Sequence, residues 1–181
     1  MLNIGVLISG GGTNLQAIID ETKSGGINGT VKLVISNKEN AYGLERARLS
    51  KIKAVYETDE DKIIELLKEN NIDLIVLAGY LKIITPKFVD EFRNKIINIH
   101  PSLIPSFCGK GYYGEKVHQG VIDYGAKVTG ATVHFVDEGA DTGAIIMQEA
   151  VNVEQDDDAK SLAKRVLEVE HRILKESIRL F

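Results

Sequence analysis

The chain has 181 residues, of which 44% are hydrophobic and 27% charged, and its formal net charge is −4. This composition is typical of one ordinary globular domain, and the negative charge disfavours a nucleic-acid-binding surface spread over the whole protein. The single cysteine, Cys108, excludes an intramolecular disulfide and a cysteine-rich zinc site, and with no apparent signal peptide or membrane-spanning apolar run we expect a cytoplasmic protein.

The first hundred residues predict strands that alternate with helices. The predicted strand 73–78 (DLIVLA) is apolar after its first residue, as in parallel strands that are covered on both faces of a sheet. Repeated strand–helix units predict an open α/β sheet. Strands are predicted at 4–8, 31–36, 54–56, 73–78 and 95–99, and helices after residue 12, at 41–49, at 59–68 and from Pro86.

The second half has a different pattern. Segments 127–136 and 144–153 are longer, and apolar and polar residues alternate between residues 128 and 135, which predicts a partly antiparallel extension of the sheet. A final helix is expected to start at 156–158. Because no linker or repeat interrupts the chain, we predict a single domain over 1–181, with a Rossmann-like, mostly parallel N-terminal half.

Three consecutive glycines, Gly10–Gly12, lie between the first predicted strand and its helix. Glycines let a backbone approach a ligand closely, and a helix N-terminus offers free N–H groups, so the pattern favours a phosphate. Leu15 stands where the third glycine of a dinucleotide fingerprint belongs, which favours a small phosphorylated metabolite. The alternative is a plain turn. Thr13 or Asn14 is predicted to cap the helix.

Asn98 and His100 end a predicted strand and, being two residues apart, should point to the same face. An amide that can donate to an oxyanion, beside an imidazole that can move protons, suits acyl transfer. No serine nucleophile motif accompanies them, so direct transfer is expected. Both this turn and the glycine loop follow strand ends, which predicts that they share one cleft.

The other histidines are less informative. His134 is interpreted as a core or sheet-surface residue, and His118 and His171 as mostly facing solvent. No histidine or acidic spacing is typical of a metal site, so no metal is predicted.

Two acidic features remain. The loop 137–143 is either a tight turn or the source of a carboxylate that would raise the pKa of His100 and fix its orientation. Glu170 lies at the edge of the apolar stripe of the last helix, where it could pair with a neighbour or face a ligand amine.

Four segments together resemble the glycinamide ribonucleotide transformylase family, the folate-dependent phosphoribosylglycinamide formyltransferases: 8–16 (ISGGGTNLQ), 77–83 (LAGYLKI), 98–105 (NIHPSLIP) and 133–143 (VHFVDEGADTG). The resemblance implies a formyltransferase fold and direct transfer of the formyl group of 10-formyltetrahydrofolate to the amine of glycinamide ribonucleotide, through a tetrahedral intermediate, in de novo purine synthesis. We expect no metal, no nucleic-acid or membrane partner, and a monomer or homodimer.

The resemblance also implies roles for individual residues. Asn98 and His100 would stabilise the tetrahedral intermediate, and Asp141 would tune His100 and order a water that shuttles protons. The N-terminal half, to about residue 100, would bind the phosphate, and the remainder would complete the folate site. The substrate-binding residues would be Gly12, Thr13, Asn14 and Glu170, and the folate-binding residues Leu81, Lys82, Ile83, Ile84, Asp137, Glu138, Gly139 and Ala140, largely through backbone groups.

The chain departs from the family at several points. Leu81 and Lys82 stand where members often have Met-Arg, the loop 57–62 is short and acidic where many members carry an arginine, and the loop 107–114 is longer than in many members. Two alternatives stay open: a formyltetrahydrofolate hydrolase, and a non-catalytic module that binds a phosphorylated metabolite. The net charge makes a tRNA-directed formyltransferase a poor fit.

Overall fold

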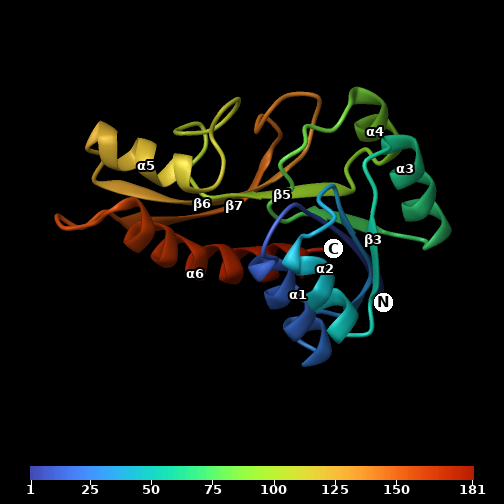
Figure 1. Cartoon of the computed structure of the whole chain (residues 1–181). Helices are drawn as coiled ribbons and strands as arrows, with labels where there is room; N and C mark the ends of the chain where they lie inside the picture. Colours follow the sequence, from blue (N-terminus) through green and yellow to red (C-terminus); the bar gives the residue numbers. More distant parts are fainter.

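Alternating strands and helices build one twisted seven-stranded sheet in the computed structural model, which describes residues 1–181 (Figure 1). The strand order is β3-β2-β1-β4-β5-β6-β7; the first five strands are parallel, and β6 and β7 are antiparallel to their neighbours. The fold prediction is therefore confirmed. The strands are β1 (Leu2–Ile8), β2 (Gly29–Ser36), β3 (Lys53–Tyr56), β4 (Leu74–Leu77), β5 (Ile96–His100), β6 (Val128–Phe135) and β7 (Ile145–Asn152).

Helices cover both faces of the parallel part of the sheet. The helices are α1 (Thr13–Lys23), α2 (Tyr42–Leu49), α3 (Glu60–Glu69), α4 (Pro86–Glu91), α5 (Glu115–Tyr124) and α6 (Ala159–Ile178). One buried cluster joins the sheet to α1, α2 and α6, and a second joins the opposite face to α3 and α4. In β4, Leu74 and Val76 belong to the first cluster and Ile75 and Leu77 to the second, which is why that strand is apolar throughout. None of the helices is long and apolar enough to cross a membrane.

Local sequence signals explain where helices α4 and α6 begin. Pro86 is the first residue of α4, and the side chain of Asp158 accepts from the Ser161 backbone N–H in a capping box that opens α6. The prediction for α1 is wrong, because its N-cap is Gly12, with φ 71°, and no side chain caps it. Thr13 and Asn14 lie inside the helix instead, so the N–H groups of its first turn are left free.

Helix α5 is the one element that the sequence pattern did not predict. It follows the glycine-rich loop 107–114 and contains Gly120, where a Cβ would lie 3.1 Å from the ring of Tyr112. The glycine therefore lets the loop pack closely on the helix. The expectation that His118 faces solvent is also wrong: it is 4% exposed on the inner side of α5, and burial lowers its pKa to about 4.

The sheet topology decides which residues meet. The carboxyl ends of β1, β4 and β5 lie at the same edge, because these strands are neighbours and parallel. Strand β6 runs antiparallel beside β5, so that Asn98 lies directly opposite His134 and His100 opposite Thr132. This register places two imidazoles and one amide at a single point of the sheet.

Candidate active site

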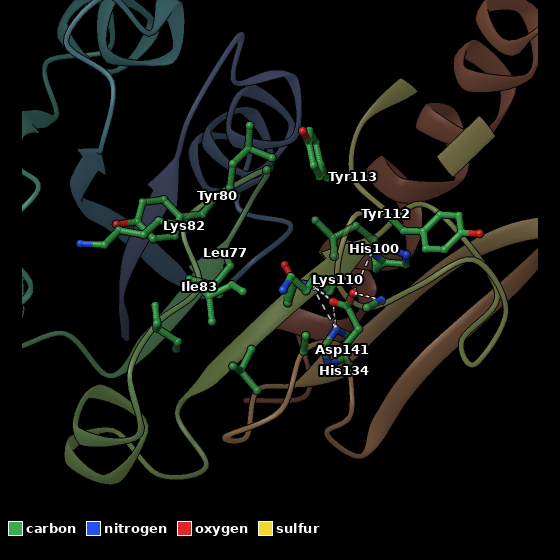
Figure 2. Close-up of a pocket in the computed structure, with 18 of the residues that line it drawn as sticks. Leu77, Tyr80, Lys82, Ile83, His100, Lys110, Tyr112, Tyr113, His134 and Asp141 are labelled. Carbon is green, nitrogen blue, oxygen red and sulfur yellow. Dashed lines mark hydrogen bonds and ion pairs between the residues drawn. The ribbon is translucent and has the colours of Figure 1, made fainter. Parts of the chain in front are cut away.

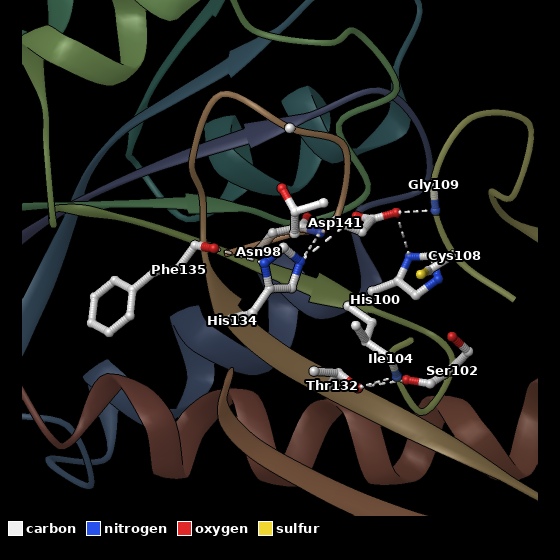
Figure 3. A network of polar contacts seen from close by, with 12 residues as sticks. Asn98, His100, Ser102, Ile104, Cys108, Gly109, Thr132, His134, Phe135 and Asp141 are labelled. Carbon is white, nitrogen blue, oxygen red and sulfur yellow. Dashed lines mark hydrogen bonds and ion pairs between the residues drawn. The ribbon is translucent and has the colours of Figure 1, made fainter. Parts of the chain in front are cut away.

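Four polar side chains from three segments converge at the end of β5 (Figure 3). Asp141, from the loop after β6, places Oδ2 3.6 Å from Nδ1 of His100, and its Oδ1 accepts a hydrogen bond of 3.4 Å from Nδ2 of Asn98. Nδ2 of Asn98 also lies 3.1 Å from Nε2 of His134. The structure thus brings together Asn98, His100 and Asp141, and it confirms that Asn98 and His100 share a face.

Backbone geometry holds Asp141 in place. Its φ of 58° is in the left-handed region, which aspartate tolerates better than most residues, and the N–H of Gly109 donates to Oδ2 at 2.9 Å. A Cβ at Gly143 would lie 1.7 Å from the carbonyl oxygen of Phe135, so the loop can return to β7 only with glycine there. The loop 137–143 is therefore a tight turn that also aims a carboxylate.

The hydrogen bonds of His100 fix its tautomer. Nε2 lies 3.0 Å from the carbonyl oxygen of Phe107, and because a carbonyl only accepts, Nε2 carries the proton. Nδ1 then faces Asp141 with a free lone pair while the ring is neutral. The 3.6 Å separation is longer than a direct hydrogen bond, so Asp141 acts on the neutral ring through its charge.

Asp141 raises the pKa of His100, as expected from the sequence, but it does not set the direction of the net shift. Burial lowers the pKa of His100 below its ordinary value, and this effect exceeds the rise due to Asp141 and the Phe107 carbonyl. Asp141 itself has a lowered pKa: burial raises it, but the imidazoles of His134 and His100 and the N–H of Gly109 lower it by more. The pair at rest is therefore a neutral imidazole beside a carboxylate.

His134 belongs to the same cluster, although its sequence context indicated only a core or sheet position. Its Nδ1 lies 2.7 Å from the carbonyl of Phe135 and so carries the proton, which leaves Nε2 to accept from Asn98. The alternation of residues 128–135 was the only signal, and it does not say which neighbouring strand His134 faces.

A cavity of about 290 Å³ opens beside this cluster (Figure 2). Its walls come from the segment after β4, the loop 107–114 and the loop after β6. Of the predicted folate-binding residues, the cavity lining includes Leu81, Lys82, Ile83, Ile84, Asp137, Gly139 and Ala140. Glu138 is not part of the lining, because its carboxylate pairs with Arg93 at 2.9 Å on the outer surface.

Apolar side chains form the side of the cavity that follows β4. Leu81 is 54% and Ile83 69% exposed, so a flat ligand placed here would cover apolar surface that otherwise faces water. Nζ of Lys82 donates to the carbonyl of Thr58 at 2.7 Å, which ties this segment to the acidic loop before α3.

The glycine loop forms a second polar group at the same edge of the sheet. Gly12 has φ 71°, and a Cβ there would lie 2.7 Å from Cα of Gly43 in α2, so only glycine fits. A Cβ at Gly10 or Gly11 would meet no atom within 4 Å, so that side of the loop is open. The backbone N–H groups of residues 11–15 have no partner in the chain.

Asn14 and Glu170 meet behind this loop, although 156 positions separate them in the sequence. Nδ2 of Asn14 donates to the Glu170 carboxyl at 2.8 Å, while Oδ1 of Asn14 is buried without a partner. Glu170 is only 8% exposed, and burial raises its pKa from the ordinary 4.5 to about 7, against the lowering effect of Asn14.

The cluster at the end of β5 and the glycine loop are adjacent, but they do not line the same cavity. The lining of the 290 Å³ cavity includes neither residues 10–14 nor Glu170. Ser9, just before the glycine loop, connects this loop to the cavity wall. Its Oγ accepts from the backbone N–H of Leu81 at 2.8 Å and donates to Asn37 at 2.6 Å. The site is thus an elongated edge with a polar loop at one end and the cavity at the other. No group of three or more His, Cys, Asp or Glu side chains is arranged to hold a metal ion.

Comparisons with known proteins agree with the motifs. The family model described as "Formyl transferase" matches residues 2–178. A phosphoribosylglycinamide formyltransferase of Haemophilus influenzae is 46% identical over 183 residues, which cover 96% of this chain and 84% of that protein. A chloroplastic phosphoribosylglycinamide formyltransferase of Arabidopsis thaliana is 41% identical over 185 residues, which cover 97% of this chain.

The fold of this chain is also similar to that of a solved crystal structure. The crystal structure of glycinamide ribonucleotide transformylase 1 from Symbiobacterium toebii has a TM-score of 0.93 and 44% identity, and the match covers 100% of this chain and 87% of that one. The chain spans 63% of the Arabidopsis relative and 59% of the one from Vigna unguiculata. The resemblance inferred from the sequence is confirmed, and the chain belongs to the formyl transferase family, among the phosphoribosylglycinamide formyltransferases.

Proposed function

We propose that this chain transfers the formyl group of 10-formyltetrahydrofolate to the amine of glycinamide ribonucleotide, giving formylglycinamide ribonucleotide in de novo purine biosynthesis. The observation that carries the proposal is the convergence of Asn98, His100 and Asp141 at one end of a cavity with exposed apolar walls. The names of the relatives support the choice of substrates.

The reaction needs an oxyanion stabiliser and a proton carrier, and the cluster offers both. The amine nitrogen attacks the formyl carbon, and the formyl oxygen becomes an oxyanion that accepts from Nδ2 of Asn98 in place of the long 3.4 Å contact with Asp141. His100, neutral with its proton on Nε2, takes the amine's proton on Nδ1, and the resulting imidazolium is stabilised by Asp141. The C–N10 bond then breaks as that proton passes to N10 of the folate, directly or through a water held by Asp141.

The glycine loop and Glu170 hold the acceptor substrate in this proposal. The free N–H groups of Gly12, Thr13 and Asn14, at the positive end of the α1 dipole, bind the phosphate. The unpartnered Oδ1 of Asn14 accepts from the sugar or the amine, and the Glu170 carboxylate attracts the glycinamide end. Each of these contacts satisfies a polar group that the chain itself leaves without a partner or keeps buried.

The folate lies in the cavity beside the cluster. Leu81, Ile83 and Ile84 cover its rings, and backbone groups of 137–140 hydrogen-bond to the pterin edge, with Glu138 contributing backbone only. Lys82 and Lys110 are the lysines of the cavity lining, and the acidic loop 57–62 supplies none of the arginines that many family members carry there. Residues before about 100 hold the phosphate, and the later residues complete the folate site.

The purified chain tests this function with both substrates present. Release of tetrahydrofolate should require glycinamide ribonucleotide and match the formylated product mole for mole. Release at the same rate without the ribonucleotide would instead identify a hydrolase, and phosphate binding without turnover would identify a binding module. A cytoplasmic location, the absence of nucleic-acid and membrane partners, and a monomer or homodimer stay predictions; both plant relatives are described as chloroplastic.

A further inference from the structure

We propose that Arg46, on α2, is a positioning residue for the phosphate-binding loop: its Nε–H bond to the Gly11 carbonyl turns the loop so that its N–H groups face the phosphate. The inference rests on the proposed function and names a residue outside the predicted site. The bond from Nε of Arg46 to the Gly11 oxygen is 2.7 Å long. Nothing in the sequence pattern points to Arg46, because it lies 35 positions from Gly11.

Two carbonyls of the loop point toward α2. The backbone N–H of Gly43 donates to the carbonyl of Gly10 at 3.0 Å, and Arg46 holds the carbonyl of Gly11. In a trans peptide the C=O and the following N–H point in opposite directions. The N–H groups of Gly11 and Gly12 therefore point away from α2, and neither has a partner in the chain.

Arg46 is itself held in one orientation. Its side chain packs along the loop, since a Cβ at Gly12 would lie 3.5 Å from Cδ of Arg46. The guanidinium lies 4.9 Å from the ring centroid of Tyr42, and Nη1 is 3.4 Å from Oε1 of Gln16 on α1. A side chain fixed on three sides holds a carbonyl more firmly than a mobile one can.

The guanidinium makes no ion pair of its own. The acidic neighbour on the same helix, Glu45, pairs with Arg48 at 3.6 Å. Arg46 therefore donates its hydrogen bonds to the loop backbone and to Gln16, which is the pattern expected of a residue that shapes the loop.

Three substitutions separate the hydrogen bond from the charge. Arg46→Gln places an amide nitrogen at the chain position of Nε and removes the charge; Arg46→Lys keeps the charge and removes the Nε donor; Arg46→Met removes both. Arg48→Met, two residues along α2, is the matched control, because the side chain of Arg48 is exposed and its ion pair is with Glu45, not with the glycine loop.

The assay is steady-state formyl transfer, with the KM of the ribonucleotide and of the formyl donor measured separately. Arg46→Met should raise the ribonucleotide KM roughly tenfold and leave the donor KM within about twofold, and Arg46→Gln, unlike Arg46→Lys, should restore most of the affinity. With glycinamide riboside, which lacks the phosphate, all variants should match the wild type. Arg48→Met should be normal with both acceptors.

Several results would overturn the inference. These are a normal ribonucleotide KM in Arg46→Met, an equal loss with the riboside, or recovery in Arg46→Lys and not in Arg46→Gln. If the wild type itself transfers no formyl group, the proposed function fails. NMR titration of the Gly11 and Gly12 amides with inorganic phosphate then tests separately whether Arg46 positions the loop. Weaker phosphate-induced shifts in Arg46→Met than in Arg46→Gln support the inference, and equal shifts contradict it.

Discussion

Replacing Asp141 with asparagine keeps the size of the side chain and removes its charge from the cluster at the end of β5. In the wild type the carboxylate lies 3.6 Å from Nδ1 of His100, and both side chains are largely buried. At an effective dielectric constant of about 20, a unit charge at that distance stabilises the imidazolium by roughly 4 to 5 kcal/mol before other groups rearrange. The imidazolium is the form that His100 takes up as the amine attacks.

Part of this energy is recovered in the variant, because asparagine can still accept from the Gly109 N–H and a water can solvate the ring. We therefore expect kcat to fall roughly 10²- to 10³-fold, with little change in either KM. The pKa of His100, which burial already lowers, should fall further without the carboxylate, and NMR of the ring can follow it. A kcat within fivefold of the wild type, or a His100 pKa that does not fall, would refute the reasoning.

Three other variants test other parts of the account. Burial gives Glu170 a pKa of about 7, so its carboxylate becomes populated as the pH rises through 7; the ribonucleotide KM should fall over that range in the wild type and stay flat in Glu170→Gln. Because the folded-state pKa of Glu170 is raised, its carboxyl group stabilises the fold below about pH 4.5, and this contribution is lost as the pH rises through 7. The free energy of unfolding in urea should therefore depend less on pH in Glu170→Gln than in the wild type. Gly143→Ala places a Cβ 1.7 Å from the Phe135 carbonyl and should cost on the order of 3 kcal/mol in urea denaturation; a normal midpoint would show that the loop adapts freely. Asp158→Ala removes the cap of α6 and should cost about 1 kcal/mol in the same measurement, and an unchanged midpoint would mean that the capping box is dispensable.

Local patterns in the sequence were enough to predict the strands, whose ends differ from the structure by one or two residues, and the shared face of Asn98 and His100. Both depend on periodicities of a few residues, which the chain encodes directly. Helix α5 was missed because Gly120 in its middle masks a helical pattern whose stability comes from packing on α6 and on the loop before it.

The long-range contacts of the site could not be predicted. His134 reaches Asn98 only because β6 pairs with β5 in one register, and no local pattern specifies that register. Likewise, Asn14 and Glu170 meet because α6 packs on α1, and the direction of the His100 pKa shift depends on how deeply the ring is buried. These are properties of the assembled sheet and its helices.

The most direct test of the central claim is single-turnover formyl transfer from 10-formyltetrahydrofolate to glycinamide ribonucleotide by the wild type and by His100→Ala. If His100 is the proton carrier, the variant should fold normally by circular dichroism, bind both substrates, and transfer the formyl group roughly 10²- to 10⁴-fold more slowly. A transfer rate within tenfold of the wild type would contradict the account, because Asn98 and Asp141 alone would then be sufficient for the chemistry.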